Sequence, residues 1–371
     1  MSIPKKLLNA AVKNQTALDQ YGHNLEGKVQ SLLRTVENEI VGRVAYMDPT
    51  APTMTEWKIK RLEALKQQIK YLLDETYKKI INDMSDTLQI VSGLQEDYTI
   101  KSFNKAVKVD LFKVVLTPEN LKSIVEKSLI DGKLISDWFQ KQNADLQSRL
   151  FTVLQEGTLR IQSGLVQGES IGELIGRIRG NKQWSPIMNI SRRETAALVR
   201  TSVMSVANAA RMETYQANAD VLDGFEWIST LDSRTTLLCA SLDGKRFDMD
   251  MNPVGHSIPF PGIPAHWGCR SCLCPVTKSW AELAGANGRT KKQINQLNNI
   301  PKGERASMNG PIPAQTYDEW LRDQSEETQK EILGPGRFDL WKRNKLGMAD
   351  LVNNKGNPIP LEQLKQRLKV K

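Results

Sequence analysis

The sequence gathers its metal-ligating and nucleophilic side chains into one short segment. All four cysteines and two of the three histidines lie between residues 239 and 274. Thiolates and imidazoles are ligands that zinc prefers, and a C-x2-C spacing lets two sulfurs reach one ion. Cys269 and Cys272 have that spacing, and His266 lies three residues upstream. The predicted ligands of a structural zinc ion are Cys239, His266, Cys269 and Cys272, with Cys274 and His256 in reserve.

Two other interpretations of this segment stay open. The cysteines can be small buried hydrophobic residues, with the histidines satisfied by other partners. Alternatively, Cys239 and His266 form a thiol nucleophile and its base, with Asp232 or Asp243 orienting the imidazole. Zinc is favoured because residues 227–280 contain few bulky apolar side chains. A structural zinc ion can contribute roughly 10 kcal/mol to the folding of such a loop-rich segment.

The sequence before this segment predicts helices. Apolar residues recur every three or four positions between 55 and 94, which is typical of a long amphipathic helix. A similar pattern runs from 29 to 44 and ends before two prolines, so the first hundred residues are predicted to form a helical hairpin. The apolar positions of the longer helix are Leu62, Leu65, Ile69, Leu73, Tyr77, Ile80, Met84, Leu88 and Val91.

The middle of the chain shows further helix starts. Residues 107–116 are compatible with a short strand, and Thr117 followed by Pro118 predicts that a helix begins there. Two capping boxes begin at Ser170 and Ser191, each with a glutamate three residues later. The second predicts an alanine-rich helix that continues to residue 219.

From residue 223 the composition changes to Asp, Gly, Pro and Ser, with a short strand predicted at Trp227 and Ile228. We therefore predict a mainly α fold with a small loop-rich α+β unit. The predicted segments are an N-terminal helical arm (1–112), a helical middle domain (113–222), a Cys/His module (223–280), a linker (281–315) and a C-terminal helical unit (316–371).

The 371 residues carry a formal charge of +9, and 40% of them are hydrophobic. We see no secretory signal and no run of 18 apolar residues, and therefore expect a protein without a membrane segment that is made in the cytoplasm. The positive charge suits an anionic partner such as DNA, or a solvated basic surface. The candidate nucleic-acid contacts are Arg289, Lys291, Lys292, Lys365, Arg367 and Lys369.

Several motifs in the 223–280 segment resemble one family. They are Leu231–Thr236 followed by Cys239, Leu242–Gly244, Pro264–Arg270 and Pro275–Val276. Their order and spacing resemble the phage Mu F-like minor head, or head morphogenesis, proteins. Residues 164–178, 196–208 and 317–341 are similar to the flanking parts of that family, so the resemblance covers residues 130–371. We call residues 223–280 the Mu F-like module.

The sequence departs from the family pattern at two places. Ser202 follows Arg200 and Thr201 where the family commonly has a glutamate. Ser271 lies between Arg270 and Cys272, where the family often reads Cys-Arg-Cys. The second departure gives this chain its C-x2-C spacing and affects the choice of zinc ligands.

The resemblance implies a minor structural protein of a tailed-phage head rather than an enzyme. Its implied partners are the portal protein, other capsid or scaffold components, and packaged double-stranded DNA. The implied location is the virion head near the portal, after synthesis in the host cytoplasm, and the implied action is in head assembly or DNA delivery. The alternative functions are a DNA-binding zinc protein and a cysteine-dependent or toxin-like enzyme.

Overall fold

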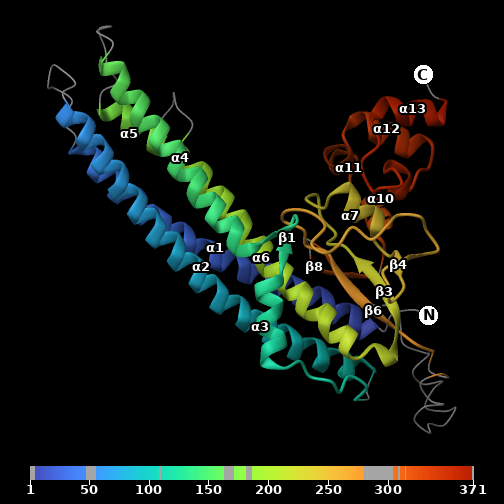
Figure 1. The fold of residues 1–371 in the computed structure, drawn as a ribbon. Helices are drawn as coiled ribbons and strands as arrows, with labels where there is room; N and C mark the ends of the chain where they lie inside the picture. Colours follow the sequence, from blue (N-terminus) through green and yellow to red (C-terminus); the bar gives the residue numbers. More distant parts are fainter. Residues whose placement is uncertain are drawn as a thin grey trace. The chain divides into compact units, whose positions relative to one another are not determined.

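A computed structural model describes residues 5–46, 56–107, 110–162, 171–180, 186–279, 282, 304–307, 310–313 and 315–369 (Figure 1). The chain divides into two compact units. The first unit comprises Met1–Asp19, Val91–Ile124 and Met204–Lys371, and the second unit comprises Gln20–Ile90 and Val125–Val203.

Helices make up most of the described chain, and the predicted mainly α fold class with a small α+β part is confirmed. None of the described helices combines the length and apolar character needed to cross a membrane. The helices are α1 (Lys5–Ala45), α2 (Glu56–Val107), α3 (Pro118–Lys127), α4 (Ile135–Gln162), α5 (Ile171–Arg179), α6 (Ile187–Ala217), η1 (Ala219–Val221), α7 (Leu237–Leu242), α10 (Tyr317–Arg322), α11 (Glu326–Leu333), α12 (Pro335–Arg343), η2 (Met348–Leu351) and α13 (Leu361–Leu368).

The predicted helical hairpin is present as α1 and α2 (Figure 1). All nine apolar residues that predicted the longer helix lie on α2 and are buried. In the second unit, ion pairs join α6 to α1 and α4, and a buried contact joins it to α2. These pairs are Arg192–Glu37, Arg200–Glu26, Arg149–Glu194 and the Tyr77–Thr195 hydroxyl contact.

Two local predictions in this part of the chain are wrong. Helix α6 begins at Ile187, directly after Pro186, so Ser191 lies inside the helix instead of capping it. A proline is readily accommodated at the start of a helix because the first turn leaves its N–H groups unpaired. The hydroxyl group of Ser191 is buried without a hydrogen-bond partner. Ser170, the other predicted cap, lies outside the described residues.

The predicted strand at 107–116 is also absent from the described residues, because side chains take the place of a neighbouring strand. Residues 110–117 form an extended segment of the first unit. Asn104 Oδ1 accepts hydrogen bonds from two of its backbone N–H groups, Asn218 Oδ1 from two more, and Glu96 from a fifth. Buried backbone donors need such partners, and here amide and carboxylate oxygens supply them.

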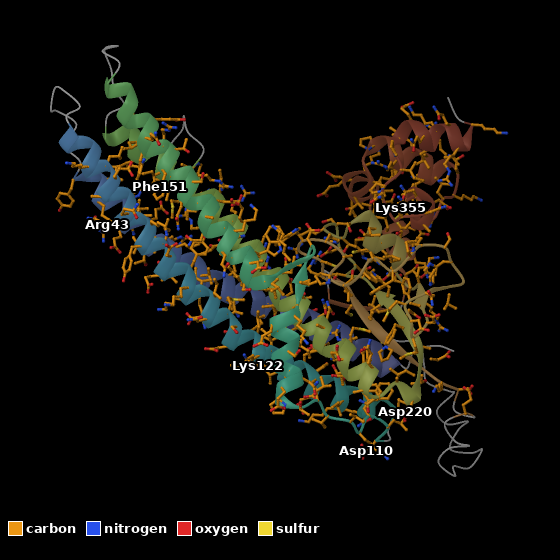
Figure 2. All side chains as sticks on the ribbon, viewed as in Figure 1. Arg43, Asp110, Lys122, Phe151, Asp220 and Lys355 are labelled. Carbon is orange, nitrogen blue, oxygen red and sulfur yellow. The ribbon has the colours of Figure 1, made fainter. Side chains whose placement is uncertain are left out.

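A four-stranded antiparallel sheet forms the centre of the module, and the strand predicted at Trp227 and Ile228 is part of it. The sheet order is β5-β4-β3-β6, so β3 lies between β4 and β6. Asp220, labelled in Figure 2, lies in η1, which joins α6 to β3. The strands of this sheet are β3 (Leu222–Ile228), β4 (Arg246–Phe247), β5 (Pro253–Val254) and β6 (Cys272–Thr277).

Two other strand pairs are two-stranded antiparallel hairpins. The pair β1 (Leu129–Ile130) and β2 (Lys133–Leu134) precedes α4 in the second unit. The pair β7 (Glu304–Ser307) and β8 (Gly310–Pro313) lies within the predicted linker, in the first unit. Residues 304–307 and 310–313 of that linker are therefore two paired antiparallel strands.

The described residues of the first unit form two apolar clusters. One surrounds the sheet and includes Trp227 and Phe225 together with Phe103 of α2 and Phe112 of the extended segment. Phe103 and Phe112 stack with their ring centroids 3.7 Å apart. The second cluster joins Leu231 and Ala240 of the module to the helices that follow the linker. Its largest members are Tyr317, Trp320, Phe338 and Trp341.

Candidate metal centre

Three of the predicted ligands meet beside the short helix α7. Thr236 caps this helix, and its side chain accepts a hydrogen bond from the backbone N–H of Cys239, which lies in the first turn. His266 and Cys269 come from the loop that precedes β6. Cys239 Sγ lies 3.9 Å from Cys269 Sγ and 3.2 Å from His266 Nε2. All three ligand atoms lie within 4.8 Å of one another.

These separations match the edges of a metal tetrahedron. With Zn–S near 2.3 Å and Zn–N near 2.0–2.1 Å, tetrahedral angles place the ligand atoms about 3.5–3.8 Å apart. The observed 3.9 Å and 3.2 Å lie close to this range on either side. Cys239, His266 and Cys269 are therefore close enough to bind one metal ion.

The ring of His266 is oriented for ligation. Its Nδ1 lies 2.9 Å from the carbonyl oxygen of Trp267. Since a carbonyl oxygen can only accept, Nδ1 carries the proton and donates it, which leaves the Nε2 lone pair directed at the thiols. Metal-binding histidines are commonly held by such a hydrogen bond to a backbone carbonyl.

The protein environment favours a thiolate at Cys269. A hydrogen bond from the Cys239 thiol lowers the pKa of Cys269 well below its usual range, against the effect of burial, and His266 lowers it further. The same hydrogen bond, with burial, raises the pKa of Cys239. Hydrogen bonding to Cys269 raises the pKa of His266. The site thus stabilises negative charge on one sulfur, and a cation bound there would favour loss of the remaining thiol proton.

The other predicted ligands lie elsewhere in the module. Cys272 is the first residue of β6, where it is buried opposite Ile228, and it does not belong to the three-residue group. Cys274 follows on the same strand, and burial raises the pKa of its thiol well above the usual value. His256 Nε2 lies 2.8 Å from the carbonyl oxygen of Arg246, away from the thiols. Both reserve ligands are therefore outside the group.

A buried ion pair, which the sequence did not predict, lies next to the centre. The Arg270 guanidinium makes two hydrogen bonds to the Asp232 carboxylate, and both side chains are largely buried. Burial alone would raise the pKa of Asp232, but Arg270 outweighs that effect and holds the pKa below its ordinary value. The signal was present in the sequence, because both residues belong to the motifs that carry the family resemblance.

The second acid considered for a catalytic role has a different task. Asp243 accepts a hydrogen bond from the backbone N–H of Ser229 at 2.7 Å and from that of Tyr317 at 2.8 Å. The Tyr317 hydroxyl donates to the backbone carbonyl of Asp232. Both acids therefore join parts of the first unit, while the Nδ1 of His266 pairs with Trp267. The arrangement differs from the predicted Cys–His–Asp alternative.

The candidate nucleic-acid contacts fall in two places. Arg289, Lys291 and Lys292 lie outside the described residues. Lys365 and Arg367 lie on α13, and Lys369 is its C-cap. Lys365 is paired with Glu362 at 2.9 Å. Residues 315–369 contain ten Lys or Arg and nine Asp or Glu residues, so this unit carries little of the chain's net positive charge.

Comparison with known proteins finds one family. Residues 155–274 match the family described as phage Mu protein F like protein. No curated protein and no solved structure gives a significant match. The matched segment contains all three residues of the candidate centre and both members of the Asp232–Arg270 pair. The resemblance predicted from the motifs is confirmed over residues 155–274, which are similar to the phage Mu F-like family, and that family suggests a role in phage head morphogenesis.

Proposed function

We propose that this chain is a minor structural protein of a tailed-phage head that acts at the portal vertex during head assembly or DNA delivery. The observation that carries the proposal is the family match over residues 155–274. Its partners would be the portal protein, other capsid or scaffold components and packaged double-stranded DNA. Its place in the virion would be the head, near the portal.

The proposed role is structural rather than catalytic. Cys239 and Cys269 are only 2% and 1% exposed, which suits a stabilising metal better than a nucleophile that must reach a substrate. The acids beside them are engaged in a buried ion pair and in backbone hydrogen bonds. The alternatives of a cysteine-dependent or toxin-like enzyme would need an acid or base directed at an accessible thiol.

We also propose that the metal is a structural zinc ion held by Cys239, His266 and Cys269. Two thiolates and one imidazole are a donor set typical of zinc. The ion would stabilise α7 and the loop before β6, because it would tie together segments that are 27 to 30 residues apart in sequence. Cys272 as a fourth ligand stays a prediction.

Mass spectrometry of purified virions tests the proposed function. The protein should be present at low copy number in full heads and absent from heads produced without its gene. Comparing full particles with particles emptied of DNA then separates a retained vertex component from a protein that leaves with the genome. Absence of the protein from full, purified particles would contradict the proposal.

The charge of +9 supports contact with DNA as a second candidate function. A titration of DNA binding against salt concentration tests it. Neutralising several phosphates predicts a steep linear fall of log K with log salt concentration, with a slope near −0.9 for each contact. A slope near zero would leave the head proteins as the only proposed partners.

A further inference from the structure

The described residues include every cysteine and histidine of the chain. This limits which side chains can supply the fourth ligand of the metal centre. All four cysteines and all three histidines are described. Three of these residues form the group, while Cys272 and Cys274 are buried on β6. His256 lies beside a backbone carbonyl, and His23 lies 3.1 Å from Glu26 on its own helix. Among the described residues no Asp or Glu joins the group either.

In this arrangement the described side chains supply three donors, and a fourth donor would come from outside the group. Zinc bound by three protein ligands is typically completed by solvent or by an exchangeable ligand, whereas structural sites use four protein ligands. Two thiolates and a neutral imidazole balance the charge of Zn²⁺. The centre can then accept either a neutral or an anionic fourth ligand without the cost of a large uncompensated charge.

The position of Thr236 shows where such a ligand would bind. Its Oγ1 lies 3.1 Å from His266 Nε2, so the hydroxyl borders the ligand atoms. Thr236 is exposed, and so is Trp267, the residue that follows His266. The two cysteines are buried. The group is therefore closed on its sulfur side and bordered by solvent on the side of Thr236.

We propose that this is a three-ligand Cys2His centre whose fourth coordination position, beside Thr236, is exchangeable. It takes solvent in the isolated chain and accepts a soft anionic donor, a thiolate, from outside. The inference rests on the proposed metal centre and competes with the predicted Cys272 ligand, and the experiment below distinguishes the two.

Cobalt substitution tests the proposal in the full-length protein. Co²⁺ adopts the same tetrahedral sites as zinc, and each thiolate adds to its sulfur-to-metal charge-transfer absorption. We expect the wild-type protein to show absorption for two thiolates. Adding 2-mercaptoethanol should raise this intensity by about half, as expected for a third thiolate. The Cys272→Ser variant should behave in the same way.

Variants at position 236 provide the matched controls. Thr236→Cys should show the three-thiolate intensity without added thiol, and 2-mercaptoethanol should then add nothing. Thr236→Val should respond to added thiol as the wild type does. Circular dichroism of each variant verifies folding, so that a lost signal is not mistaken for unfolding.

Three results would overturn the inference. One is a three-thiolate spectrum in the wild type that falls to two thiolates in Cys272→Ser. Another is a wild-type spectrum that added thiol leaves unchanged, and the third is a folded protein that takes up no cobalt. Incorporation into heads is measured separately. If the protein enters heads but added thiol does not bind its metal centre, only this inference is contradicted. If added thiol binds the centre but the protein is absent from heads, only the proposed function is contradicted.

Discussion

At the scale of single residues, four buried cysteines separate into two kinds. Cys239 and Cys269 lie in a helix turn and a loop, where their sulfurs can approach a third ligand. Cys272 and Cys274 lie on β6, where the extended backbone carries Cys272 away from the loop. A C-x2-C spacing brings two sulfurs to one ion only if the residues between them form a tight turn. Here the strand begins at the second cysteine.

Removing one sulfur from the centre should remove the metal. We expect about one zinc per chain in the wild type and nearly none in Cys239→Ser or Cys269→Ser. A ligand present at 1,000 times its Kd stabilises the folded state by about 4 kcal/mol, so both variants should melt at lower temperature. Chelation of the wild type should lower its Tm in the same way. Elemental analysis and thermal unfolding measure these effects.

Cys274→Ser is the matched control for this prediction, because Cys274 is equally buried but lies outside the group. The Cys274→Ser variant should keep its zinc. A zinc chelator should lower its Tm by the same amount as it lowers the Tm of the wild type. Zinc-replete Cys239→Ser protein with an unchanged Tm would contradict the assignment of Cys239 as a ligand.

The Asp232–Arg270 pair should make stability depend on pH in the acid range. The pKa of Asp232 is lowered in the folded state, so its contribution is complete above the unfolded value near 3.8. That contribution is lost as pH falls through the folded pKa. Asp232→Asn leaves the largely buried Arg270 without its partner and should cost about 3–5 kcal/mol at neutral pH.

Unfolding measured between pH 7 and pH 2 checks this prediction. The stability difference between the wild type and Asp232→Asn should be constant down to about pH 5 and should narrow below the unfolded pKa of the acid. Asp223→Asn, at an exposed position of β3, is the control and should follow the wild type. A difference that stays constant to the lowest pH would contradict a role for the Asp232 charge.

At the scale of elements, periodic apolar residues predicted the helices better than short local signals did. The stripe on α2 repeats over many turns, and burial of its whole face outweighs any single residue. By contrast, Ser191 has the sequence of a helix cap but lies within α6, because Pro186 already permits an earlier start. The extended segment 110–117 donates some of its hydrogen bonds to residues well outside it, to Asn218 and to Glu96. No window of neighbouring residues contains that information.

Glycines in two kinds of element should respond oppositely to alanine. Gly224 in β3 has a φ of +144°, and a Cβ there would lie 2.2 Å from the carbonyl oxygen of Phe247. Gly224→Ala should therefore destabilise the module by at least about 2 kcal/mol. Gly27 lies in α1, and a Cβ there meets nothing within 4 Å. Gly27→Ala should stabilise the protein by about 0.5–1 kcal/mol, because glycine weakens a helix interior.

Denaturant unfolding of both variants measures the difference. Both substitutions replace glycine by alanine. A change in the free energy of unfolding that is the same in both variants would therefore be an effect of the added methyl group itself. Equal stability of the two variants would show that β4 moves aside without cost at Gly224. That result would contradict the close approach of the two strands.

At the scale of the whole molecule, the sequence predicted the composition of the site but not its connections. The clustering of cysteines and histidines identified three of the residues that meet, since they share one loop-rich segment. One partner of the extended segment, Asn218, lies 104 and 105 residues away from the residues that it pairs with. Phe103 and Phe112 belong to the predicted arm, yet they share one apolar cluster with Tyr215 and Trp227. Such contacts depend on the folded arrangement.

This shared cluster bears on the predicted boundary at residue 112, which stays a prediction. Phe112 stacks on Phe103 and lies edge-on to Tyr215, at centroid distances of 3.7 Å and 6.1 Å. A chain that begins at Lys113 would lose both phenylalanines, and Tyr215 would lose its contact with Phe112. Large aromatic truncations in a core cost about 3–5 kcal/mol each, which approaches the total stability of many domains. We therefore expect the 113–371 fragment to unfold without a cooperative transition.

Two point variants of the full chain make the same test independent of the fragment's solubility. Phe103→Ala should lower the free energy of unfolding of the first unit by about 3–5 kcal/mol, because it removes a fully buried ring. Tyr71→Ala changes an exposed aromatic residue of the same helix and should shift stability by less than about 0.5 kcal/mol. Near-ultraviolet circular dichroism and denaturant unfolding compare the wild type with the Phe103→Ala and Tyr71→Ala variants. A soluble 113–371 fragment that melts cooperatively, together with a stable Phe103→Ala variant, would show that the arm is a separate domain and that the sheet supports its own core.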